Sequence, residues 1–186
     1  MEAMMRKDGL YWLRKHGGRP MDGRGVTILE HSLQCAALAV ADGAPDALVV
    51  AALLHDVGRL LPESVSNATG SDRAHELLGA RFIGRTFAPE VSEPVRLHIE
   101  AKRYLAHDPA YAASMSEAAR DALAEQGGAY AEWQVEGFSA VPYAEDAIRL
   151  RRWDDRAIVP GLDVPCLEHY VGRIERLLRP RLTVSG

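Results

Sequence analysis

Residues 51–58 read Ala-Ala-Leu-Leu-His-Asp-Val-Gly, so His55 and Asp56 stand side by side at the end of a long apolar run. Residues 48–54 are apolar on nearly every face of the helix that the sequence predicts over 45–58, which indicates a central, buried helix. A carboxylate in such surroundings costs several kcal/mol unless something pairs with it. A metal ion is one such partner, and it would need further ligands from elsewhere in the chain.

The rest of the sequence also predicts helices. Thr27 and Glu30 form a capping box ahead of a helix that Gly43 ends, and the polar stretch 62–72 reads as a surface loop. The spacing of apolar residues predicts helices over about 27–43, 72–87, 89–105, 116–126, 130–139, 143–156 and 165–178. Because no strand alternation of convincing length appears, the expected fold class is all-α.

Length and composition are those of one globular domain, with 186 residues, 47% hydrophobic and 26% charged. Since no repeat or linker interrupts the chain, we expect a single domain over 1–186. Its core should span about 21–178, behind a short N-terminal extension over 1–20. Cys35 and Cys166 lie far apart in apolar helical patterns, so they are expected to be buried free thiols and not a disulfide.

Charge and hydropathy exclude several classes of partner. The formal net charge is −4, which leaves no basic footprint for nucleic acid, so any bound anion should be small. No apolar run approaches the roughly 18–20 residues that a membrane span needs. Residues 1–20 also lack the apolar stretch of a signal peptide, so we expect a cytoplasmic protein with no membrane partner.

Six histidine and aspartate residues form a candidate metal site. A single histidine on an apolar face is usually a hydrogen-bonded core residue, and that interpretation stays open for each one taken alone. Together, on helices that can converge in a bundle, they offer nitrogen and oxygen ligands for two transition-metal ions. The six residues are His31, His55, Asp56, His75, His98 and Asp154.

Two basic residues lie one helical turn from these candidate ligands. Lys102 follows His98 by four residues, and Arg151 precedes Asp154 by three. Positive charge beside a metal site is unfavourable unless an anionic substrate, such as a phosphate or phosphonate, lies between them. The alternative is that both side chains merely pair with surface acids.

The order of the candidate ligands resembles that of the HD-domain superfamily, whose members are all-α metalloproteins and mostly phosphohydrolases. Longer segments resemble a narrower group, the PhnZ-type mixed-valence di-iron oxygenases of phosphonate catabolism. The resemblance runs from about residue 21 to residue 175. It rests on residues 29–34, 51–58, 97–105, 126–128 and 151–155.

The resemblance implies an HD-domain bundle around two iron ions, Fe(II) and Fe(III), with O₂ as co-substrate and a small 1-hydroxyphosphonate as substrate. One iron would be held by His31, His55, Asp56 and Asp154, and the other by Asp56, His75 and His98. Asp56, as the bridge, and Lys102 would be catalytic, and the phosphonate would lie against Lys102, Gln126 and Arg151. The chain would act as a monomer or homodimer.

The sequence departs from that group around the substrate. A Tyr-x-Gly-Glu segment, whose Glu receives a substrate ammonium group, is replaced by Met21-Asp22-Gly23-Arg24, and a Gly-His pair by Gly58-Arg59. Ala119 and Ala122 replace two hydroxyl residues. Arg24 and Arg59 are therefore expected to bind substrate and to favour a neutral or anionic tail. The alternative is that Arg24 points to solvent and Asp22 replaces the Glu.

Two other functions remain open at this stage. A metal-dependent phosphohydrolase acting on a small phosphate ester or nucleotide could use the same ligands, with Lys102 and Arg151 stabilising the developing charge. Ligand identity does not separate the two, because histidine and carboxylate suit iron, manganese and zinc alike. An inactive HD module that binds a ligand or a protein is the third possibility, although it would have no reason to keep six ligand positions.

Overall fold

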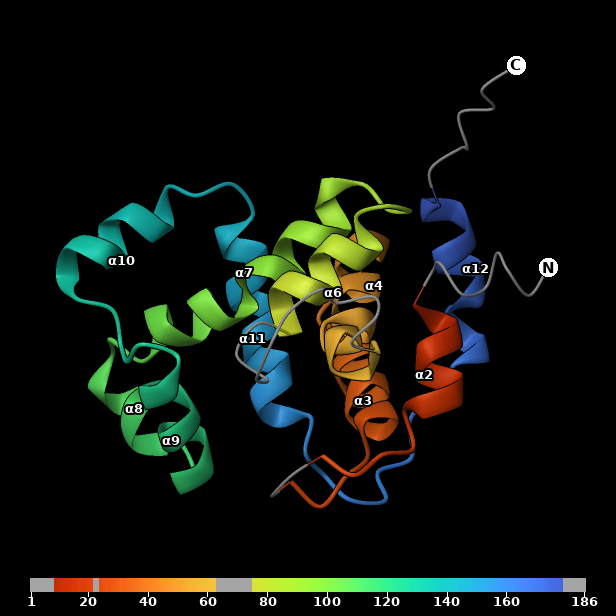
Figure 1. Ribbon diagram of the computed structural model, residues 1–186, viewed down its shortest axis with the longest axis horizontal. Helices are drawn as coiled ribbons and strands as arrows, with labels where there is room; N and C mark the ends of the chain where they lie inside the picture. Colours follow the sequence, from red (N-terminus) through yellow and green to blue (C-terminus); the bar gives the residue numbers. More distant parts are fainter. Residues whose placement is uncertain (1–8, 22–23, 63–74, 179–186) are drawn as a thin grey trace.

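The structure is a computed structural model that describes residues 9–21, 24–62 and 75–178 (Figure 1). All regular elements in these residues are helices, which confirms the expected all-α class. In chain order they are α2 (Leu10–His16), α3 (Ile28–Ala41), α4 (Asp46–Leu54), η1 (Val57–Leu60), α6 (His75–Ile83), α7 (Pro89–Leu105), α8 (Pro109–Ser114), α9 (Glu117–Glu125), α10 (Glu132–Ser139), α11 (Ala144–Arg156) and α12 (Glu168–Leu177).

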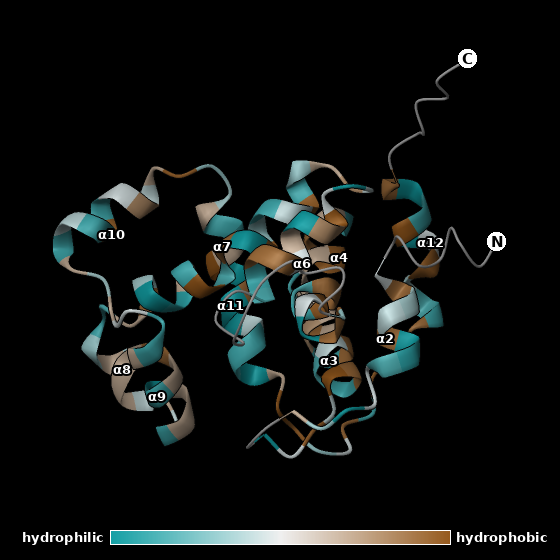
Figure 2. Cartoon of the chain, in the orientation of Figure 1, coloured by the Kyte–Doolittle hydropathy of each residue, from teal (hydrophilic) through white to brown (hydrophobic). Residues whose placement is uncertain are grey.

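Helix α4 forms the centre of the fold, as its apolar sequence predicts. Every residue from Leu48 to Leu54 is buried, and α3, α7, α11 and α12 pack around the helix. Figure 2 shows α4 in the hydrophobic colour among helices that are mixed in character. The surrounding helices therefore enclose the side chains at the carboxyl end of α4.

The central helix is shorter than predicted. It ends at Leu54 and not at Gly58, His55 is its C-terminal cap, and Asp56 leaves the α-helical region with φ −97° and ψ 8°. The chain continues as the short 3₁₀ helix η1, in which Gly58 passes against the backbone of His75. This break turns the Asp56 carboxylate away from the helix axis and toward α6.

The other predicted helices are present with small shifts at their ends. The helix expected over 72–87 ends at Ile83, where a turn closed by Thr86 N–H on the Ile83 carbonyl takes over. Its first residues and most of the expected loop 62–72 lie outside the described residues. The short helices α2 and α8 were not predicted, because six or seven residues carry too little periodic signal.

One of the two cysteine predictions is wrong. Both thiols are free and Cys35 is buried, but Cys166 is exposed because α12 begins two residues later, at Glu168. The residue therefore lies in the irregular segment before the last helix.

Helices α8, α9 and α10 lie to one side of the central bundle, at the left in Figure 1. A second small apolar cluster joins α10 to α7 and α11 through Phe138, Leu97 and Ala147. Among the described residues, no helix combines the length and hydrophobicity that crossing a bilayer requires.

Candidate metal centre and anion pocket

Four histidines from four different elements meet at the end of the central helix. His31 comes from the N-terminal part of α3, His55 from the end of α4, His75 from the start of α6, and His98 from α7. All four are buried. The Nε2 atoms of His31 and His55 lie 3.1 Å apart, and those of His75 and His98 lie 3.3 Å apart.

The outer nitrogens of three of these rings are held by backbone carbonyls. The Nδ1 of His31 lies 2.7 Å from the carbonyl oxygen of Ala157. The Nδ1 atoms of His55 and His98 lie 2.8 and 2.7 Å from the backbone carbonyl oxygen three residues earlier in the chain. Each Nδ1 must therefore carry a proton, so each ring in its neutral form turns an Nε2 lone pair inward. Facing lone pairs repel unless a cation lies between them, so this donor set fits a metal ion.

Asp56 lies between the two histidine pairs. Its Oδ1 is 3.0 Å from Nε2 of His75, while its Oδ2 is 3.7 Å from Nε2 of His55 and 3.9 Å from that of His31. One carboxylate thus presents a different oxygen to each pair, which is the arrangement that a bridging ligand needs. Asp154 lies beside the pair of His31 and His55 only, with its Oδ1 3.1 Å from Nε2 of His31.

The protonation states of Asp56, Asp154 and His98 suit metal ligands, which bind in their unprotonated forms, whereas burial lowers the pKa of His31 but Cys35 and Asp154 outweigh it and hold that pKa well above its usual range. Burial raises the pKa of Asp56, but Arg59, His55 and His75 outweigh it and hold that pKa well below its usual range. Burial also raises the pKa of Asp154, but Arg151 and His31 outweigh it and hold that pKa well below the usual range. Burial and the neighbouring His75 keep the pKa of His98 well below that of free histidine.

Cys35 extends the first histidine pair. Its Sγ lies 3.8 Å from Nε2 of His31, and His31, Cys35 and His55 form one of two groups of potential ligand atoms within 4.8 Å of one another. The other group is Asp56, His75 and His98. The i, i+4 spacing of Cys35 from His31 placed the thiol on the same helix face, although sequence reasoning assigned it only to the core.

The three residues expected to hold a phosphonate lie beside this centre. Lys102 is buried on α7 and donates to Oε1 of Gln126 at 3.0 Å. Arg151 is buried on α11 and donates to Oδ2 of Asp154 at 2.6 Å and to Asp155. Asp155 is only half-buried, so Arg151 has a partly exposed acidic partner as well as Asp154, and the binding role of both basic residues stays a prediction.

The turn that carries Gln126 is fixed from α7. Gly127 and Gly128 have positive φ values of 102° and 74°, and the Arg103 guanidinium donates to both of their carbonyls. Gln126 closes α9 just before this turn, which sets its amide against Lys102. The Gly127–Gly128 turn therefore helps to position Gln126.

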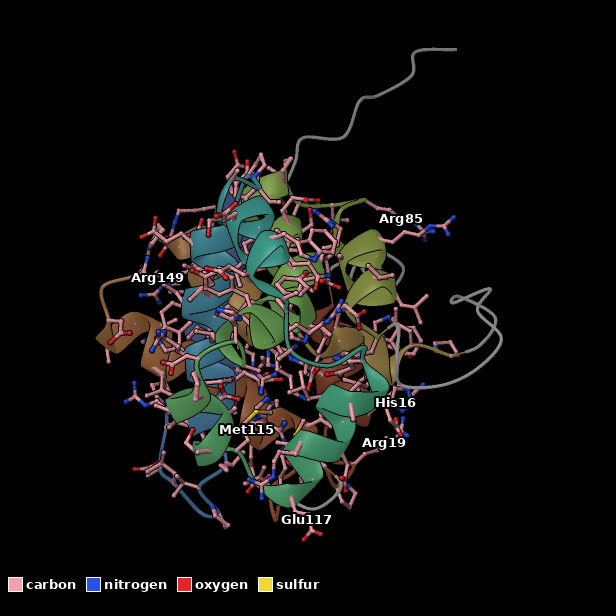
Figure 3. The ribbon with its side chains drawn as sticks, turned by 90° about the vertical axis from the view of Figure 1, so that its left-hand side faces the viewer. His16, Arg19, Arg85, Met115, Glu117 and Arg149 are labelled. Atoms are coloured by element: carbon pink, nitrogen blue, oxygen red, sulfur yellow. The ribbon has the colours of Figure 1, made fainter. Side chains whose placement is uncertain are left out.

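A cavity of about 640 Å³ opens next to the centre, between the segment before α3 and helices α8 and α9. Among the described residues that line it, six are basic and one is acidic. The basic residues are Arg19, Arg24, Arg59, Lys102, Arg151 and Arg156, and the acidic one is Asp155. Figure 3 looks onto this side of the molecule, with Arg19 and Met115, both lining residues, on the lower half of the face.

Arg24 and Arg59 both reach carboxylates of the candidate metal centre. Nη1 of Arg24 lies 3.1 Å from Oδ1 of Asp154, and Nε of Arg59 lies 3.0 Å from Oδ1 of Asp56. The alternative in which Arg24 points to solvent is therefore wrong, and Asp22 lies outside the described residues. Ala119 and Ala122 line the cavity, so neither position supplies a hydroxyl group to a bound ligand.

Several lining residues were missed by sequence reasoning. Arg19 lies in the irregular segment before α3, Tyr111 on the short helix α8, and Arg156 at the last residue of α11. Arg19 and Tyr111 fall outside the predicted helices, and Arg156, at the end of one, is not spaced one helical turn from Asp154. A cluster of basic residues around one cavity could be found only once the helices were placed.

Comparison with known proteins identifies the family of this chain. The HD domain model matches residues 28–125, which is more than half of the chain. The chain therefore belongs to the HD-domain family. Within it, the chain is 37% identical to a hydroxymethylphosphonate dioxygenase from Gimesia maris, over 93% of this chain and 88% of that protein. It is 33% identical to a glycine-betaine-forming 1-hydroxy-2-(trimethylamino)ethylphosphonate dioxygenase from Leisingera caerulea, over 88% and 85%.

Proposed function

We propose that this protein is an O₂-dependent di-iron oxygenase that cleaves the carbon–phosphorus bond of a small 1-hydroxyphosphonate. The observation that carries the proposal is a centre of inward-facing Nε2 and carboxylate atoms beside a cavity lined by basic side chains. Both relatives described above are named as phosphonate dioxygenases, which supports the same reaction class.

The overall reaction balances without any further reductant. R–CH(OH)–PO₃²⁻ and O₂ give R–COO⁻, HPO₄²⁻ and H⁺. The bond between C1 and phosphorus breaks, C1 reaches the oxidation level of a carboxylate, and the substrate supplies all four electrons that O₂ accepts. Phosphate and a carboxylate are therefore formed in equal amounts, one of each per O₂ consumed.

The centre has the ligands for two ions. We assign His31, His55, Asp56 and Asp154 to one iron and Asp56, His75 and His98 to the other, with Asp56 as the bridge. A mixed-valence iron pair held there would supply the redox chemistry that couples O₂ to the oxidation of C1. The backbone carbonyls on Nδ1 of His31, His55 and His98 keep these rings in the tautomer that binds metal.

The protein's own residues bind and orient the substrate. Lys102 and Arg151 come from helices that pack together, α7 and α11, and place two cations beside the centre. They would donate to the phosphonate oxygens, while the Gln126 amide holds the Lys102 ammonium in place. Fixing the phosphonate on this side leaves C1 facing the carboxylates and histidines.

Turnover with and without O₂ tests the reaction class. Iron-loaded protein should release phosphate from hydroxymethylphosphonate in air, with one O₂ consumed per phosphate, and should release none under argon. Electron paramagnetic resonance should detect the mixed-valence pair. Phosphate release that continues at the same rate under argon would instead identify a phosphohydrolase.

Lys102 makes anion binding depend on pH. Burial and the nearby Arg151 lower the pKa of Lys102 to about 8. Below that pH the ammonium is charged and binds an anion, whereas above it the amine is neutral and the attraction is lost. Affinity for sulfate, whose charge stays constant in this range, should fall by up to about tenfold per pH unit above 8.

Two variants separate this charge effect from others. Lys102→Arg keeps its charge throughout and should show a flat profile from about pH 7.5 to about pH 9 by isothermal titration calorimetry, because a guanidinium does not lose its proton in this range. Lys102→Ala should keep its metal content and bind sulfate more weakly at neutral pH by about 1.5–3 kcal/mol, the value of a charge-assisted hydrogen bond. A wild-type profile as flat as that of Lys102→Arg would remove Lys102 from the anion site.

A further inference from the structure

Three residues of the cavity wall form a chain of hydrogen bonds that ends on Arg151. The Tyr111 hydroxyl on α8 donates to Oδ2 of Asp155 at 2.5 Å, and Oδ1 of the same carboxylate accepts from Nη2 of Arg151. Arg151 also donates from Nη1 to Oδ2 of Asp154 at 2.6 Å. Both terminal nitrogens of the guanidinium are therefore held by carboxylates, which fixes the orientation of its plane.

The third nitrogen of this guanidinium is left for a ligand. Arg151 is 3% exposed and lines the cavity, and its Nε–H has no hydrogen-bond partner among the described residues. A buried N–H without an acceptor costs free energy, so native sites usually supply one. An oxygen of a bound anion would satisfy this N–H, and Lys102 lines the same cavity and offers that anion a second cation.

Tyr111 contributes to this arrangement from outside the central bundle. Helix α8 lies to one side of α11 in Figure 1, and none of its six residues is buried. The Asp155 side chain is 30% exposed, so water competes for its carboxylate. Burial, together with Asp155, raises the pKa of the Tyr111 hydroxyl, which therefore keeps its proton and donates. The phenol thus holds Asp155 in the orientation in which it contacts Arg151.

We propose that Tyr111 is a positioning residue for anion binding, which acts through Asp155 to hold the Arg151 guanidinium where its Nε–H donates to a phosphonate oxygen. The inference rests on the proposed function and deepens it, by adding a residue to the phosphonate site. Without the phenol, Asp155 is free to turn toward water and presents more of its negative charge to the cavity. The first change loosens Arg151 and the second repels an anion, so both weaken anion binding.

Sulfate binding to the metal-loaded protein tests the proposal without any turnover. Tyr111→Phe keeps the aromatic ring on the cavity wall and removes only the hydroxyl group. At pH 7, by isothermal titration calorimetry, this variant should bind sulfate about three- to tenfold more weakly than the wild type and should keep its metal content.

Tyr143→Phe is the matched control. Tyr143 is half-buried against the second apolar cluster and is not among the described residues that line the cavity. Removing its hydroxyl group should therefore leave the affinity for sulfate at the wild-type value.

A double-mutant cycle with Asp155 separates positioning from a general packing role of α8. If Tyr111 acts through Asp155, Tyr111→Phe should change the affinity for sulfate by less than about twofold in an Asp155→Ala background. An effect of packing alone would persist at full size in that background. Metal content is measured in every variant, because Asp155 follows the candidate ligand Asp154 in the chain.

The outcomes keep this inference separate from the proposed function. The inference is overturned if Tyr111→Phe binds sulfate as tightly as the wild type, or if its loss of affinity is the same with and without the Asp155 carboxylate. The reaction class is tested by the wild-type protein alone, through O₂-dependent phosphate release from hydroxymethylphosphonate. A protein that shows this reaction, but whose affinity for sulfate does not depend on Tyr111, would retain the function and lose the positioning role.

Discussion

Replacing Asp56 with alanine is expected to remove both metal ions and with them all O₂-dependent phosphate release. The two carboxylate oxygens face different histidine pairs, Oδ1 toward His75 and Oδ2 toward His31 and His55. A bridging ligand serves two ions, whereas a terminal ligand serves one. Loss of a residue that merely orients a ligand lowers metal affinity by about 10–100-fold, so loss of the bridge should exceed this.

Variants of the terminal ligands give the contrast that identifies the bridge. Asp154→Ala should lose the ion beside His31 and retain the other, and His75→Ala should do the reverse, as measured by elemental analysis. His107→Ala serves as a histidine control, because His107 is exposed and bonds the Tyr130 carbonyl outside the centre. A full complement of both metals in Asp56→Ala would show that the bridging assignment is wrong.

Much of the fold follows from local signals that are strong in this chain. The predicted capping box of Thr27 and Glu30 is present, and α3 begins at Ile28, the residue after Thr27. The uniformly apolar run in α4 correctly indicated a buried central helix. The break after Leu54 was missed because the apolar pattern continues through Val57 and Leu60. A 3₁₀ turn requires no residue type that would distinguish it from a continuing α-helix.

The ligand-type residues were found from the sequence because histidines and aspartates stand out in apolar helices. Their spacing along the chain could not predict where they meet, since the meeting point depends on how α3, α4, α6 and α7 cross. The same limit applies more strongly to the cavity. Arg19 and Arg156 lie far apart in the chain and line one cavity because the segment before α3 passes close to the end of α11.

Replacing Gly58 with alanine is expected to destabilise the fold strongly, although the change adds only one methyl group. A Cβ at Gly58 would lie 1.9 Å from the His75 carbonyl oxygen and 2.9 Å from the Gly79 amide nitrogen. Both are backbone atoms, so η1 and α6 must move apart. Overpacking of this kind costs about 3 kcal/mol or more, which lowers the midpoint of thermal unfolding by roughly 6–12 °C.

The displacement should also reach the metal centre, because His75 is the residue that the new methyl group would push. Gly58→Ala is therefore expected to lose the ion held by His75 and His98 more readily than the ion beside His31. Gly137→Ala provides the control, since Gly137 is exposed on α10 and a Cβ there meets nothing within 4 Å. That substitution should stabilise the protein slightly, by about 0.5–1 kcal/mol, with both ions retained. If Gly58→Ala unfolded at the wild-type temperature with both ions in place, close packing of η1 on α6 would not be what positions His75.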